Sequence, residues 1–70
     1  MPRIVIDLQS TALARASYQL DDEADVGTLD VTFTSGRTYT HENVPQKVFE
    51  GLRDAQSPGS YYNNEIKGVY

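Results

Sequence analysis

The strict alternation of residues 29–34, Leu-Asp-Val-Thr-Phe-Thr, constrains the fold of this chain more than any other sequence feature. Apolar and polar side chains alternate at every step, and the apolar ones are branched or aromatic, which is typical of a strand with one buried face. Ser35 and Gly36 then indicate a turn, and residues 37–41 supply a returning strand. We therefore predict a β-hairpin in this part of the chain.

The length of the hairpin turn decides where two aromatic side chains point. A two-residue loop would place Tyr39 beside Thr32, whereas a three-residue loop ending in a left-handed glycine would place Tyr39 opposite Val31. The longer loop would also place His41 opposite Leu29. Because a shift of one residue moves every side chain to the other face, the two registers give opposite results. We favour the three-residue loop, which keeps Tyr39 on the apolar face.

Alternation also predicts a strand upstream of the hairpin, over residues 12–20. Its apolar face would carry Ala12, Ala14, Ala16, Tyr18 and Leu20. Residues 3–8 alternate only weakly and would form at most a short edge strand. The acidic run 21–25 and the following glycine end the main strand, and we expect this run to form a solvated turn.

Two proline-led helices are predicted after the hairpin, because proline suits the first helical position. The first begins at Val44-Pro45 and carries an apolar stripe of Val48, Phe49, Leu52 and Ala55. Gly51 within it suggests close packing at that point. The second begins at Ser57-Pro58, with Ser57 as its cap.

The apolar side of the second helix would carry Tyr62, Ile66 and Val69, which leaves Tyr61 exposed. The predicted fold is one α+β domain over residues 1–70. It consists of a three-stranded antiparallel β-meander followed by two short helices packed on one face.

Composition excludes several classes of function. The 70 residues contain no cysteine and one histidine, His41, which excludes disulfides, thiolate metal sites and two-histidine metal pairs. We therefore expect no metal and no cofactor. A domain this small has a thin stability margin, so self-association is an expected compensation. No apolar run is long enough for a signal peptide, and we expect a cytoplasmic chain that begins near Met1 and binds no membrane.

The net charge of −4 disfavours general binding of polyanions. Four of the ten acidic residues lie between positions 21 and 25, so the rest of the chain is electrically balanced and leaves room for a local basic surface. Catalysis is not expected. A Ser-His-Asp device would need His41 with an oriented carboxylate and a nucleophile elbow, and no Gly-x-Ser-x-Gly sequence is present. The clustered acids lie in a predicted loop, in a domain too small for a deep cleft.

Several short motifs together resemble a known family. They are Leu29-x-Val31-x-Phe33, Gly36, Tyr39-x-His41, Val44-Pro45, Ala55-x-Ser57-x-Gly59, Tyr61-Tyr62-Asn63 and Tyr70, with Ser10 and Tyr18 upstream. In this combination the chain resembles the KTSC family, named after the C-terminal extension of lysyl-tRNA synthetase, over about residues 10–70. His41 departs from the family's Tyr-x-Tyr pattern. The resemblance implies a small bacterial or phage domain, and its link to the synthetase suggests RNA binding by association.

The candidate binding residues lie on the hairpin and the second helix. Ser57, Gly59 and Ser60 would form an anion site at a helix start, with Asn63 and Lys67 further along the same polar face. Ordinary helix capping explains the same serine and proline equally well. Tyr39 and His41 would stack bases if they lie on an open face, whereas the favoured register makes Tyr39 a core ring.

Two hypotheses for function follow. The first is a non-catalytic accessory domain for RNA or single-stranded nucleic acid. In it Arg15, Arg37 and Lys67 contact phosphates, Tyr61 stacks on a base and the turn of residues 57–60 holds a phosphate. The alternative is a protein-interaction module that binds itself as a homo-oligomer, or another protein. The small core, the acidic balance and the surplus of tyrosines favour that alternative.

Overall fold

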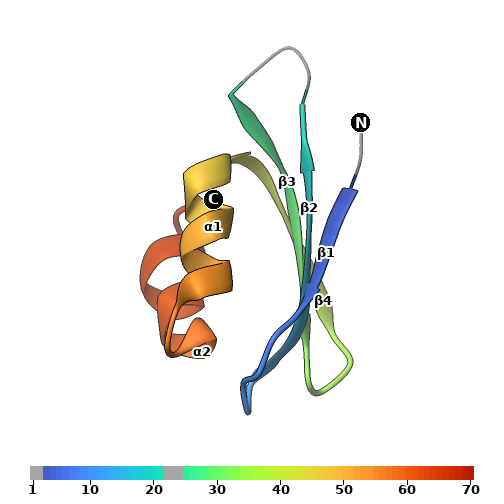
Figure 1. Cartoon of the computed structure of the whole chain (residues 1–70), viewed down its shortest axis with the longest axis vertical. Helices are drawn as coiled ribbons and strands as arrows, with labels where there is room; N and C mark the ends of the chain where they lie inside the picture. The colour runs from blue at the N-terminus through green and yellow to red at the C-terminus, as the bar shows by residue number, and fades with distance from the viewer. Residues whose placement is uncertain (1–2, 22–24) are drawn as a thin grey trace.

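The computed structural model describes residues 3–21 and 25–70 and shows an antiparallel sheet with helices on one face (Figure 1). Its four strands follow chain order across the sheet. They are β1 (Arg3–Asp7), β2 (Leu13–Leu20), β3 (Val26–Phe33) and β4 (Thr38–Pro45). The helices that follow are α1 (Gln46–Asp54), α2 (Pro58–Tyr61) and the π-helix η1 (Tyr62–Ile66). The α+β class is therefore confirmed.

Residues 3–21 and 25–70 form four strands rather than the predicted three. The weakly alternating residues at the start of the chain form β1, which pairs with β2 from Arg3 opposite Gln19 to Asp7 opposite Arg15. Its apolar residues run without a break from Ile4 through Val5 to Ile6. Because one of these three points away from the helices, the run hides the period of two that marks a half-buried strand.

The buried face of β2 differs from the prediction because of a β-bulge. The pairing with β3 shifts between Leu13 and Arg15, so the alternation changes phase at that point. Leu13 is fully buried, whereas Ala12 is exposed and Ala14 only half-buried. Downstream of the bulge Tyr18 is buried as predicted.

The three-residue loop of the hairpin is confirmed. Val31 lies opposite Tyr39 and Leu29 opposite His41, and Gly36 has a positive φ of 97°. A second irregularity follows in β4, where Asn43 has a φ of 59° and the pairing with β3 shifts. This bulge turns Val44 inward, where it is fully buried.

The helix starts differ slightly from the prediction. Pro45 precedes the first residue of α1 instead of being that residue, and Phe49 within α1 is buried as predicted. The second helix begins at Pro58, but Ser57 makes no side-chain cap and instead bonds the Ser60 hydroxyl at 3.1 Å. None of the helices in the described ranges is long and apolar enough to cross a bilayer.

Tyr18 ties the sheet to the first helix. Its ring stacks on Phe49 with a centroid distance of 5.0 Å and an interplanar angle of 10°. Its hydroxyl donates a buried hydrogen bond of 2.7 Å to the carbonyl oxygen of Val44. One side chain of β2 therefore fixes both the end of β4 and the helix that follows it.

We expect Tyr18→Phe to lower the free energy of unfolding by about 1–3 kcal/mol, because the buried Val44 carbonyl loses its donor. Tyr70→Phe removes a hydroxyl from a side chain that is 39% exposed and serves as the matched control. Urea denaturation of both variants measures the difference. Equal stability of the two would contradict the role assigned to this hydrogen bond.

Gly27 lies where the sheet leaves no room for a side chain. A β-carbon there would overlap the backbone carbonyl of Gln19, and backbone atoms of the neighbouring strand do not move aside easily. Gly27→Ala is therefore expected to cost about 1–3 kcal/mol. Gly59→Ala is the control, since its β-carbon would meet that of Ala12 at an ordinary 3.5 Å. Thermal unfolding should separate the two variants, and similar midpoints would refute this account.

Candidate functional site

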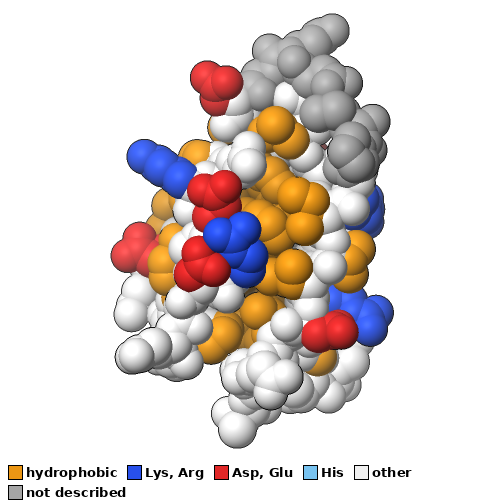
Figure 2. Space-filling model, in the orientation of Figure 1, with side chains coloured by type: hydrophobic (Ala, Val, Ile, Leu, Met, Phe, Trp, Pro, Cys, Tyr) orange, Lys and Arg blue, Asp and Glu red, His pale blue; other side chains and the backbone are white. Residues whose placement is uncertain are grey.

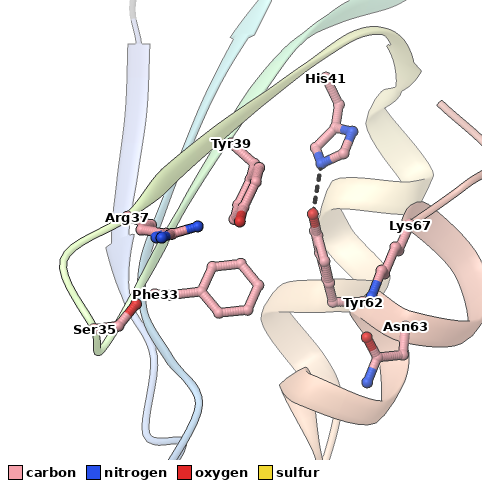
Figure 3. Close-up of a pocket in the computed structure, with 8 residues that line it drawn as sticks. All are labelled: Phe33, Ser35, Arg37, Tyr39, His41, Tyr62, Asn63 and Lys67. Atoms are coloured by element: carbon pink, nitrogen blue, oxygen red, sulfur yellow. Dashed lines mark hydrogen bonds between the residues drawn. The ribbon is translucent and has the colours of Figure 1, made fainter.

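A groove, the hairpin groove, opens between the β3–β4 hairpin and the last helix, η1. It encloses about 320 Å³, within the size range of small-ligand pockets. Figure 3 shows Phe33, Arg37 and Tyr39 on the hairpin side, facing Tyr62 and Asn63 across the opening. Eight residues line the groove: Phe33, Ser35, Arg37, Tyr39, His41, Tyr62, Asn63 and Lys67.

The hairpin supplies one wall because its register points alternate residues towards the helices. Phe33 and Arg37 flank the three-residue loop, and the Phe33 N–H donates to the Arg37 carbonyl at 2.7 Å. Tyr39 and His41 follow at steps of two along β4, so they share this face. The loop length predicted from the sequence therefore sets the chemistry of this wall.

The π-helix η1 supplies the opposite wall. Its wide turn is closed by a hydrogen bond of 2.8 Å from the Lys67 N–H to the Tyr62 carbonyl, five residues earlier. Tyr62 and Ile66 are buried against the sheet as predicted, and Asn63 and Lys67 remain exposed. Single π turns within helices occur frequently at functional sites.

Aromatic rings form the floor of the groove. Phe33 makes edge-to-face contacts with Tyr39 and with Tyr62, each at a centroid distance of 5.3 Å. His41 contacts Tyr62 in the same way at 5.5 Å. Tyr39 is 44% exposed, so the expectation of a core ring is wrong, although its predicted face is right. It lies on the edge strand, where the helices cover the sheet incompletely.

His41 is held by contacts at both ring nitrogens. Its Nε2 lies 2.8 Å from the Tyr62 hydroxyl, the dashed line in Figure 3, and its Nδ1 lies 3.4 Å from the backbone oxygen of Tyr70. A carbonyl oxygen only accepts, so in the neutral imidazole Nδ1 carries the proton and Tyr62 donates to Nε2. The position that departs from the family's second tyrosine thus has a hydrogen-bond partner in the groove.

The groove is basic although the chain is acidic. Arg37 and Lys67 line it, and none of its eight lining residues is an acid. Arg3, Arg15 and Arg53 each lie within 3.4 Å of a carboxylate oxygen. Within residues 3–21 and 25–70, no such carboxylate pairs with Arg37 or Lys67. These cations are therefore available to an anionic ligand.

The structure divides the predicted binding residues into two groups. Those that it brings together in the groove are Arg37, Tyr39, His41, Asn63 and Lys67. The remaining ones, Arg15, Ser57, Gly59, Ser60 and Tyr61, lie outside it.

Each of the second group has a different environment. Arg15 lies on the other face of the sheet, where it pairs with Asp7 at 3.3 Å. Gly59 faces Ala12 and Ser60 bonds Ser57, and the short turn of α2 does not line the groove that Lys67 lines. Tyr61 was expected to be exposed, but it is half-buried.

Tyr61 packs against Gly51 of α1, which explains that glycine. A β-carbon at position 51 would overlap the Tyr61 hydroxyl. The close packing predicted for Gly51 is therefore confirmed, and the same contact covers part of Tyr61.

Sequence reasoning missed Phe33, Ser35 and Tyr62 as residues of the groove. The two rings were assigned to the core, correctly for Tyr62, which is 4% exposed. The position of Phe33 in the sequence could have indicated this role. Phe33 is the last residue of its strand and adjoins the loop, where a short pair of helices does not cover the sheet. A ring at the end of a sheet is often buried on one side only.

Comparison with known proteins identifies the family. The KTSC domain model matches residues 9–70, and the chain belongs to this family. A KTSC domain protein from Yersinia pestis has a crystal structure of the same fold. Its TM-score is 0.83 at 22% identity, covering 97% of this chain and 90% of that one.

Relatives in sequence come from three bacteria. An uncharacterized protein of Stutzerimonas stutzeri is 37% identical over 62 residues, covering 89% of this chain and 82% of the relative. A protein of Tsukamurella paurometabola is 33% identical over 60 residues, covering 86% and 84%. A lysine–tRNA ligase of Nostoc punctiforme is 38% identical over 52 residues, which are 74% of this chain but 9% of that enzyme.

We expect stability to fall as pH rises above about 10. Burial, with a smaller effect of Tyr39, raises the pKa of Tyr62 above its usual value of 10.0. Burial also raises the pKa of Tyr18 and of Tyr61. Above pH 10 the unfolded chain therefore loses these protons first and unfolding is favoured, whereas below it these groups are protonated in both states.

Urea denaturation at a series of alkaline pH values measures this fall. Tyr62→Phe should make the decline shallower, because one of the shifted groups is gone. A free energy of unfolding that stays constant well above pH 10 would show that these hydroxyls ionise as freely in the folded chain as in the unfolded one.

Proposed function

We propose that the hairpin groove binds a single-stranded nucleic acid, RNA in the first place, without catalysing a reaction. The observation that carries this proposal is an aromatic floor beside two cations, Arg37 and Lys67, for which the described residues offer no carboxylate partner, in a protein of net negative charge. Aromatic faces hold bases, and cations beside them hold the linking phosphates. Both parts lie within one groove here.

Tyr39 is the ring best placed to stack on a base. It is 44% exposed, and Phe33 supports it from one side at 5.3 Å. Such a stack contributes about 1–3 kcal/mol per base and does not depend strongly on sequence. Arg37 and Lys67 on opposite walls would contact phosphates on either side of the stacked base. We infer binding with little base preference.

A relative supports RNA as the ligand. The matching stretch in the Nostoc punctiforme protein belongs to an enzyme named lysine–tRNA ligase. A small domain attached to an enzyme that handles tRNA fits an accessory role in holding RNA. The association links the two proteins by a shared domain and adds to the argument from the groove.

The environment of His41 supports the non-catalytic part of the proposal. Both of its ring nitrogens are engaged, by the Tyr62 hydroxyl and the Tyr70 backbone oxygen. A general base needs a free nitrogen within hydrogen-bonding reach of the substrate. We therefore assign His41 the role of fixing Tyr62 in the floor of the groove.

Binding to a fluorescent single-stranded RNA of mixed sequence tests this function. We expect affinity to fall with rising salt, and Arg37→Ala or Lys67→Ala to reduce both the affinity and the salt dependence. Tyr39→Ala should weaken binding by at least about fivefold, from the loss of one stack of about 1 kcal/mol. Lys47→Ala, an exposed lysine on α1 outside the groove, is the matched control.

The anisotropy of the labelled RNA, measured at two salt concentrations, gives these affinities. Tyr39→Phe keeps the ring and should bind as the unaltered chain does. An absence of binding at low salt would overturn the proposal. So would equal losses in Lys47→Ala and Lys67→Ala, because binding would then follow total charge and not the groove.

A further inference from the structure

The outer edge of β1 is unpaired within the part of the chain that the structure describes. β1 is the first strand of the sheet order, and its outer side faces no other strand. Ile4 is 45% exposed and Val5 is 54% exposed, so the edge is apolar. Figure 2 has the same orientation as Figure 1, and it shows apolar side chains gathered between the positions of α1 and β1. An apolar edge strand is a template for pairing with another strand.

The backbone groups that this edge offers can be identified. The Leu8 N–H donates to the Ala14 carbonyl at 2.9 Å, so these opposite residues form a hydrogen-bonded pair. In an antiparallel ladder such pairs alternate along the strand. Ile4 and Ile6 therefore bond towards β2, and the N–H and C=O groups of residues 3, 5 and 7 point outwards.

The edge is complementary to itself in one register. If two copies of β1 run antiparallel with Val5 opposite Val5, then Arg3 of each copy lies opposite Asp7 of the other. Residues 3, 5 and 7 are the ones with outward backbone groups, so this register forms every hydrogen bond that the edge can make. Opposite charges directly across a ladder stabilise it.

The same register joins the apolar side chains. Ile4 lies opposite Ile6 of the second copy, on the helix-covered face, in the pairs where the two backbones approach most closely. Val5 meets Val5 of the second copy on the other face. A shift by one residue would place outward backbone groups against inward ones and break the Arg3–Asp7 matches.

We propose that β1 is a self-recognition edge through which two copies of this chain form a dimer with one continuous sheet. The two-fold axis is perpendicular to the sheet at Val5, so the helices of both copies lie on the same face. The hairpin groove lies at β4, the opposite edge of each sheet, and stays open in the dimer. This proposal is independent of the proposed function.

Val5→Pro tests the backbone part of the proposal. Proline removes the outward N–H of Val5, and an edge strand tolerates this when that N–H faces solvent. We expect sedimentation equilibrium to show a dimer for the unaltered chain and a monomer for Val5→Pro, with an unchanged circular dichroism spectrum. Val5→Thr keeps the N–H and the branched side chain and should remain dimeric.

Charge reversal tests the register and does not depend on the fate of the proline variant. Arg3→Asp alone and Asp7→Arg alone each place like charges opposite one another, so each should dimerise about tenfold more weakly. An equimolar mixture restores opposite charges at both positions and should form a heterodimer. Within one chain Arg3 pairs with Asp30 and Asp7 pairs with Arg15, but these exposed ion pairs contribute little to folding.

Two results would overturn the proposal. One is a monomer at all concentrations, which would leave the edge to a strand of another protein or to solvent. The other is a dimer unaffected by the single charge reversals and by the proline, which would place the contact elsewhere on the surface. Failure of RNA binding would not affect either measurement.

Discussion

The stack of Tyr18 on Phe49, with its hydrogen bond to the Val44 carbonyl, is the contact on which the arrangement of the layers depends. It joins the middle of the sheet to the first helix and to the residue that leads into that helix. A domain of 70 residues buries little surface, so a single large ring with a satisfied hydroxyl has a large share in its stability. The helices are therefore held close to the sheet at this end.

The groove opens where the helices leave the sheet partly uncovered, at the end of β3 and the start of β4. Tyr62 and Ile66 anchor the last helix, while Phe33 and Tyr39 extend past the region that the helices cover. The rings contact one another edge to face and leave one side of Tyr39 open to solvent. Core packing and the candidate binding surface are thus parts of one continuous aromatic cluster, and Tyr62 belongs to both.

Much of the fold could be predicted from alternation and turn chemistry. The hairpin register followed from keeping Tyr39 on the apolar face, and the burial of Phe49, Leu52 and Ile66 followed from helical spacing. The missed strand β1 lies in an unbroken apolar run, whereas the error on the face of β2 comes from an irregularity that no period reveals. One-residue bulges near Leu13 and at Asn43 change the phase of alternation.

The candidate site was predictable in part for the same reason. Residues 37, 39 and 41 share a face once the register is known, and Asn63 and Lys67 share the polar side of the last helix. Their meeting in one groove depends on how far the helices extend over the sheet. That is a property of the packed layers and not of any segment, so Tyr61 was placed wrongly and Phe33 was missed.

The wide turn of η1 behaves as a helix with one residue inserted. Each residue of an ordinary α-helix turns the chain by about 100°, so residues five apart would point about 140° away from each other. The wide turn of η1 takes up the extra residue, and Tyr62 and Lys67 both line the groove. This turn therefore lets one short segment place a buried ring and an exposed cation at the same opening.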